Sequence, residues 1–190
     1  MKNIKILLGL SIIIIAALMS FSFLSNPNAT KDNNEKIAHG KYLVMTYGCA
    51  HCHTPKRMTD HGPVKDETLW LSGHNSKAPM PKMSPDIVAL GLIASNMDHT
   101  ARLGPWGISY SANITSDDTG IGLWTLDHFK RSMREGKHKG LENSRMVMPP
   151  MPWRDYVHMT DEDVESLYAY LQSTKPVKNV VPAFIPLDKL

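Results

Sequence analysis

The sequence predicts a mostly α-helical domain whose long irregular loops wrap one covalently attached cofactor. Apolar residues at helical spacing mark two segments, residues 35–47 and 160–175. Between them, residues 54–104 are rich in Pro, Gly, Ser, Asp and Met and show no sustained period. Irregular segments of this length are uncommon in compact domains unless they surround a ligand. A C-x-x-C-H motif at residues 49–53 indicates which ligand this is.

The motif contains Cys49 and Cys52, the only two cysteines of the 190-residue chain, and His53 follows them directly. This spacing is the attachment signature of a c-type haem. Two thiols three residues apart can bond to the two vinyl groups of the porphyrin, and the next histidine can then ligate iron from one face. We therefore predict one covalent haem c held by Cys49 and Cys52, with His53 as an iron ligand.

Three other uses of the motif fit the sequence less well. Structural zinc needs four ligands, and the sequence has neither a second cysteine pair nor a downstream H-x₃₋₅-H pair. A thioredoxin-like pair belongs at a helix start inside a βαβ unit, which the sequence lacks. A plain disulfide explains the two thiols but leaves His53 without a role.

The N-terminus has the pattern of a signal peptide or of an uncleaved membrane anchor, and we favour the anchor. Lys2 and Lys5 precede an apolar run over residues 6–24, which reaches the lower part of the length range of a membrane-spanning helix. Because lysine flanks only the N-terminal side, the positive-inside rule places the rest of the chain on the periplasmic side. We assign residues 1–24 to this segment and the polar residues 25–36 to a flexible linker.

The charge of the chain excludes one class of partner. The formal net charge is +3, and removal of Lys2 and Lys5 leaves +1 for the exported part. No basic field of the kind that binds nucleic acid is therefore present.

The expected haem-binding domain, residues 37–175, starts within the helix over residues 35–47, which ends at the glycine before the haem motif. Ile37, Gly40 and Val44 lie on one stripe of this helix. A glycine inside a helix costs roughly 1 kcal/mol relative to alanine, so Gly40 is expected to allow close contact with a second helix. A short helix over residues 87–92, with Ser84 and Pro85 at its start, interrupts the irregular stretch.

Two later helices have clear N-caps. Thr125 is the expected cap of a helix that carries Leu126, Phe129 and Met133 on one face and ends at Gly136. Thr160 is the expected cap of the final helix, which carries acidic residues in its first turn. Its apolar stripe consists of Val164, Leu167, Tyr168 and Leu171. The helix ends before residues 176–190, a proline-punctuated C-terminal tail.

The second axial position of the iron determines what such a domain can do. Methionine there gives an electron carrier with a raised potential, whereas an open position permits ligand binding or peroxide chemistry, as in a small peroxidase or gas sensor. Among twelve methionines Met151 is favoured, because Pro150 and Pro152 stiffen the loop that carries it. Met148 and Met146 share this loop and remain alternatives.

Other residues are expected to support the haem. The backbone carbonyl of Pro63 is the expected acceptor for the second ring nitrogen of His53. Trp153 and Tyr156 are placed to cover the ring. The residues expected to hydrogen-bond or pair with the propionates are Trp106, Tyr110, Asn113 and Arg145.

Four further segments carry a resemblance to a known family. Residues 104–115, 119–124, 129–136 and 149–153 read GPWGISYSANIT, TGIGLW, FKRSMREG and PPMPW. Together with the haem motif they make the chain similar to a class I c-type cytochrome. The likeness is closer still to exported monohaem cytochromes related to the cytochrome subunits of bacterial alcohol and aldehyde dehydrogenases.

This resemblance implies the cytochrome c fold, with iron bound by His53 and Met151. It also implies that the first and last helices cross through Gly40 and either Tyr170 or Leu167. A protein of this kind carries single electrons from a dehydrogenase or membrane complex to an acceptor such as a terminal oxidase or another cytochrome of a respiratory chain. It performs no substrate chemistry of its own. Dehydrogenase cytochrome subunits often have three such domains, and this chain has one haem motif.

Overall fold

The computed structural model describes residues 27–79 and 82–190, and the expected signal or anchor segment, residues 1–24, lies outside that part. The chain divides into two compact units between Glu35 and Lys36. The second unit, Lys36–Leu190, contains every residue expected to bind the haem. Within the described ranges, no helix combines the length and the apolar character that crossing a membrane requires.

Helix α2 spans Pro27–Thr46 and includes residues 27–36, which we expected to form a flexible linker. Within this segment Lys31 and Glu35, one helical turn apart, pair at 3.9 Å, and a pair at this spacing adds a few tenths of a kcal/mol to a helix. The expected C-terminal boundary at residue 47 is met within one residue.

The other helices follow the expected order. They are α3 (Cys49–His53), α4 (Asp86–Ala89), α5 (Leu126–Arg134), α6 (Trp153–Tyr156) and α7 (Asp161–Ser173), with 3₁₀ turns η1 (Glu67–Leu69), η2 (His138–Gly140) and η3 (Leu187–Lys189). Both predicted caps are confirmed, because Thr125 accepts a hydrogen bond from the His128 amide and Thr160 accepts one from the Asp163 amide. Each bond satisfies an amide that the first helical turn leaves without a partner.

Two small antiparallel sheets correct the expectation of a mostly α-helical fold. One pairs β1 (Lys56–Thr59) with β2 (Gly62–Lys65), and the other has the order β3 (Ala94–Ser95), β4 (Ala101–Gly104), β5 (Gly107–Tyr110). Strands of two to four residues are too short to show a clear alternation of apolar and polar residues. Their turns instead depend on Gly62 and Gly107, whose φ values of 99° and 101° favour glycine.

The core lies where α2 crosses α7 at Gly40. A Cβ at Gly40 would overlap the carbonyl oxygen of Ser166 and lie 2.7 Å from the Tyr170 Cβ. The expected crossing is therefore confirmed with Tyr170 as the partner. Around it the buried cluster contains Leu43, Val44, Ala50, Leu71, Ile121, Phe129, Met133, Met159, Val164, Leu167, Tyr170 and Leu171.

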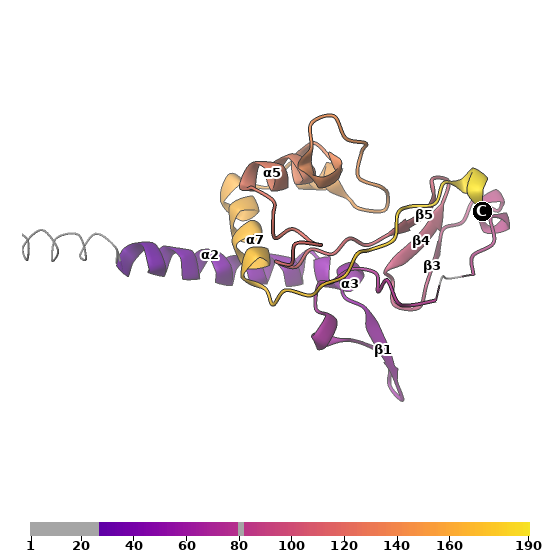
Figure 1. Cartoon of the computed structure of the whole chain (residues 1–190), viewed down its shortest axis with the longest axis horizontal. Coiled ribbons are helices and arrows are strands. Elements are labelled where there is room, and N and C mark those ends of the chain that lie inside the picture. Colours follow the sequence, from indigo (N-terminus) through magenta and orange to yellow (C-terminus); the bar gives the residue numbers. More distant parts are fainter. Residues whose placement is uncertain (1–26, 80–81) are drawn as a thin grey trace, which may run out of the picture. The chain divides into compact units, whose positions relative to one another are not determined.

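The C-terminal tail packs against the sheet that contains β5. Figure 1 shows this yellow segment running from α7 towards β5. Ile185 exchanges two backbone hydrogen bonds with Ile108, of 2.8 and 2.9 Å. The part of the tail after Pro176 is thus attached to the loops that surround the candidate site.

Candidate functional site

The C-x-x-C-H motif forms the one-turn helix α3, which positions both thiols and the histidine. Gly48 precedes it with φ of 72°, a conformation that lets α2 end and α3 begin at once. The Lys56 ammonium closes the other end by donating to the carbonyl oxygen of His51 at 2.7 Å. Cys49 is half-buried against the core cluster, and this burial raises the pKa of its thiol to about 11.

The imidazole of His53 is oriented by a backbone carbonyl. Its Nδ1 lies 2.7 Å from the carbonyl oxygen of Ala112. Because a carbonyl oxygen only accepts, Nδ1 carries the proton and donates the hydrogen bond. Nε2 is then the ring nitrogen with a lone pair for iron. Burial lowers the pKa of His53 and the bond to Ala112 opposes that change. The prediction that the Pro63 carbonyl accepts this hydrogen bond is wrong. Pro63 instead lies opposite Met58 in the β1–β2 hairpin.

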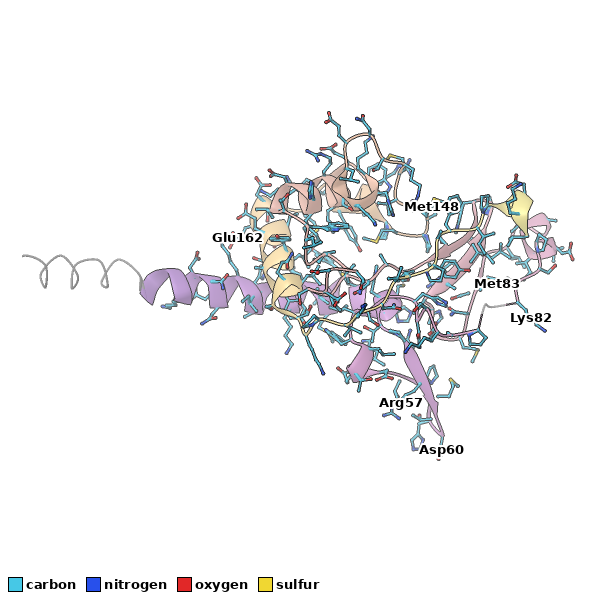
Figure 2. All side chains as sticks on the ribbon, viewed as in Figure 1. Arg57, Asp60, Lys82, Met83, Met148 and Glu162 are labelled. Carbon is cyan, nitrogen blue, oxygen red and sulfur yellow. The ribbon has the colours of Figure 1, made fainter. Side chains whose placement is uncertain are left out.

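Met151 lies on the loop between η2 and α6, half-buried and packed against the core cluster that also contacts Cys49. Met148, labelled in Figure 2, is half-buried on the same loop, and Met146 is 42% exposed. Ser109 fixes this loop to β5 by donating to the carbonyl oxygen of Pro149 at 2.6 Å. The Ser109 hydroxyl in turn accepts a 3.1 Å hydrogen bond from Trp106 Nε1.

Trp153 and Tyr156, the two aromatic residues expected to cover the haem ring, lie beside this loop. Trp153 packs on Gly136, where any Cβ would touch its indole ring. Tyr156 is half-buried against the core cluster, and this burial raises the pKa of its hydroxyl to about 12, with the thiols of Cys49 and Cys52 as smaller contributors.

The four residues expected at the propionates make other contacts. Trp106 serves the Met151 loop, as described above, and the Tyr110 ring packs on His74 at 4.8 Å. Asn113 organises the turn that follows it, through its 2.8 Å bond to the Thr115 hydroxyl. Arg145 donates to the Met146 carbonyl and lies 5.4 Å over the Phe184 ring.

Arg102 is a residue that sequence reasoning missed. Its Nη2 lies 3.7 Å from the Sγ of Cys52, and its Nε is buried without a hydrogen-bond partner. A buried guanidinium nitrogen without an acceptor is costly. Nothing in the sequence around β4 distinguishes Arg102 from an ordinary strand residue.

These contacts fit a covalent haem. Two thiols and an imidazole nitrogen with a lone pair come from one helical turn, and the Met151 side chain packs on the same core cluster as Cys49. His51, which lies between the two cysteines, stacks on His99 with ring centroids 4.7 Å apart. In the ranges that the structure describes, no three His, Cys, Asp or Glu side chains are grouped to hold a metal ion by themselves.

Comparison with known proteins agrees with this geometry. The Cytochrome c family model matches residues 37–175. The chain belongs to the cytochrome c family. The match covers the helices α3 to α7 and both sheets, so the family domain here combines helices with two small sheets.

Several relatives of this cytochrome are parts of dehydrogenases. It is 37% identical over 162 residues to the cytochrome c subunit of the quinone alcohol dehydrogenase from Gluconobacter oxydans, covering 84% of this chain and 26% of the relative. It is 30% identical over 155 residues to the fructose dehydrogenase cytochrome subunit of Gluconobacter japonicus, covering 80% and 24%. A nicotinate dehydrogenase subunit from Pseudomonas putida is 42% identical over 80 residues, covering 42% and 6%. The chain thus spans about a quarter or less of the length of these relatives.

Proposed function

We propose that this cytochrome is a one-electron carrier with a single haem c, attached through Cys49 and Cys52 and ligated by His53 and Met151. The observation that carries the proposal is the pairing of α3 with the Met151 loop. Cys49 and Met151 pack on one apolar cluster, while the bond from His53 Nδ1 to Ala112 leaves Nε2 available. An iron held by two protein ligands in an apolar site exchanges electrons without binding substrate.

The residues of the chain divide the work. Cys49 and Cys52 would hold the haem on α3 through thioether bonds. His53 and Met151 would bind its iron, and Tyr156 and the core cluster would exclude water around Met151. The haem, when bound, supplies a reversible ferric–ferrous couple.

Visible spectra of wild type and of Met151→Ala in both oxidation states test the methionine. We expect Met151→Ala to lose the weak far-red band of sulfur bound to ferric iron. Met148→Ala is the matched control, because Met148 is half-buried on the same loop, and it should keep the band. The reverse result assigns the ligand to Met148 and overturns this part of the proposal.

Two further measurements separate the carrier from a protein with an open iron position, such as a small peroxidase or gas sensor. A reduced iron that is already bound by His53 and Met151 should resist carbon monoxide, whereas an open iron binds it readily. Release of the pigment into acidified organic solvent would contradict the thioether bonds to Cys49 and Cys52.

The electron donor that we propose is a dehydrogenase, with a terminal oxidase or another cytochrome as acceptor. The support comes from relatives named as subunits of alcohol, fructose and nicotinate dehydrogenases. Native membranes supplied with each of these three substrates in turn should reduce the purified oxidised protein with at least one of them. Reduction that is equally fast without any added substrate would contradict a dehydrogenase donor.

We also propose that the protein acts on the periplasmic side of the cytoplasmic membrane, anchored by residues 6–24. The support is the sequence pattern of lysines followed by an apolar run. Intact protein should stay with the membranes after a high-salt wash and be released by detergent. Full release by salt would show a free or peripheral carrier instead.

A further inference from the structure

The tail after α7 is joined to the loops around His53 by one buried amide. Asn179 is only 7% exposed, and its Nδ2 donates to the carbonyl oxygens of Ser72 at 2.7 Å and His74 at 2.8 Å. Its Oδ1 accepts from the Ser76 amide at 3.1 Å. A single side chain therefore fixes three backbone groups within residues 72–76.

Residues 72–76 lie directly beside His53. The Gly73 amide donates to the carbonyl oxygen of His53 at 2.8 Å, and the His74 amide donates to the Ser111 carbonyl at 2.9 Å. A Cβ at Gly73 would lie 2.5 Å from the carbonyl carbon of Ala112. Because these segments are in van der Waals contact, a shift of residues 72–74 displaces the Ala112 carbonyl that accepts from His53.

The position of Asn179 is itself fixed from a second side. Its own amide donates to the Thr119 hydroxyl at 2.9 Å. The Asn113 side chain, which follows Ala112 directly, donates to the carbonyl oxygen of Val177 at 2.8 Å. The Ile185–Ile108 pair holds the far end of the tail. Asn179 is thus held from both sides, and it fixes residues 72–76, which contact His53 and Ala112.

We propose that Asn179 is a positioning residue for His53, acting through residues 72–74 and the Ala112 carbonyl to set the reduction potential of the iron. This inference rests on the proposed ligation by His53. A firm bond from Nδ1 to a carbonyl makes the imidazole a more basic ligand, which favours ferric iron and lowers the potential. Loosening that bond raises the potential. No part of the tail after Lys175 lies within the matched family region.

The test compares Asn179→Ala with Val180→Ala, since Val180 is the next residue and is 68% exposed. We expect Asn179→Ala to raise the reduction potential and to leave the far-red methionine band in place, because the Met151 loop is fixed by the bond from Ser109 to the Pro149 carbonyl. Amide exchange at Gly73 should become about tenfold faster, which corresponds to about 1.4 kcal/mol of lost protection. Val180→Ala should match wild type in all three measurements.

The outcomes separate this inference from the proposed function. A wild type without a covalent haem or without a histidine ligand contradicts the proposed function. If the wild type has a covalent haem and a histidine ligand, equal reduction potentials of Asn179→Ala and Val180→Ala overturn the positioning role. This holds even if Asn179→Ala unfolds at a lower temperature. Should Asn179→Ala fail to fold, Asn179→Ser replaces it, with a smaller rise in potential expected and equality with Val180→Ala again overturning the role.

Discussion

The helical part of the domain and the part built from strands and loops are held together by different interactions. Helices α2, α5 and α7 meet through apolar side chains, with Gly40 at the closest approach. Residues 54–79 and 82–123 are also joined to the tail by hydrogen bonds between polar side chains and distant backbone groups. Asn113 and Asn179 each bridge residues more than 60 positions apart.

The two parts serve the candidate site differently. The helical part supplies α3 and the apolar wall on which Cys49 and Met151 pack. The loop part supplies the groups that orient the ligands, the Ala112 carbonyl for His53 and the Ser109 hydroxyl for the Met151 loop. Stability is thus concentrated in one part and ligand orientation in the other, and substitutions in the two parts should have different signatures.

The largest loss of stability is expected at the helix crossing. Gly40→Ala adds a Cβ that overlaps the Ser166 carbonyl oxygen, and we expect a loss of about 3 kcal/mol in the free energy of unfolding. Helix propensity alone would give a gain of about 1 kcal/mol, so the sign of the change tests the contact. Urea unfolding measures it.

The matched control for Gly40→Ala is Ala38→Gly, at an exposed position of α2. It should cost about 1 kcal/mol through helix propensity alone. If Gly40→Ala proves as stable as wild type, the helices do not meet closely at Gly40.

Helices α5 and α7 and the close contact of a second helix at Gly40 could be predicted from the sequence, whereas the helical residues 27–36 could not. The caps Thr125 and Thr160 and the stripe on α7 follow local rules, because each depends on residues within one or two turns. The loop part could not be predicted in this way. The acceptor for His53 lies 59 residues away in the chain, and no spacing rule connects Ala112 with His53.

The candidate site shows the same division. The spacing of Cys49, Cys52 and His53 is a local pattern, and those assignments, like Met151, stay predictions that the contacts fit. Arg102 and Asn179 gave no signal, because their roles depend on how distant loops meet. Bonds of this kind become visible only when the fold is known.

In the loop part, the largest effect on stability is expected at Asn113. Its Oδ1 accepts from the amide and hydroxyl of Thr115, and its Nδ2 donates to Thr119 and to the Val177 carbonyl. Asn113→Ala leaves buried donors and acceptors without partners, and we expect a loss of about 2 kcal/mol. Thermal unfolding measures this loss.

The control for Asn113→Ala is Asn143→Ala, because Asn143 is exposed, and it should change stability by less than about 0.5 kcal/mol. Because Asn113 follows Ala112, Asn113→Ala should also raise the reduction potential, which Gly40→Ala should not. A change in stability with no change in potential would contradict the division between the two parts.

A smaller effect is expected at the helix caps. Thr160→Ala removes the acceptor for the Asp163 amide, which lies 3.1 Å from the Thr160 hydroxyl, and should cost about 1 kcal/mol. Thr160→Ser keeps the hydroxyl and should keep most of that energy. Neither variant should alter the potential, because the Thr160 hydroxyl caps α7 and lies outside the loops that orient the ligands. A shift in potential for Thr160→Ala would show that α7 also orients the site.

The smallest effect is a dependence of stability on pH at the contact between α2 and α7. His39 lies 2.7 Å from the Asp163 carboxylate, and this bond, followed by the bond to Thr160, lowers the pKa of Asp163 in the folded protein. A carboxyl whose pKa is lower when folded stabilises the protein above its unfolded pKa, about 3.9. That contribution is lost as the pH falls through the lower folded value. The stability difference between wild type and Asp163→Asn should therefore shrink as the pH falls below about 4. Because both side chains are partly exposed, salt should reduce this difference at neutral pH. A difference that grew as the pH fell would show that Asp163 is not stabilised by its charge.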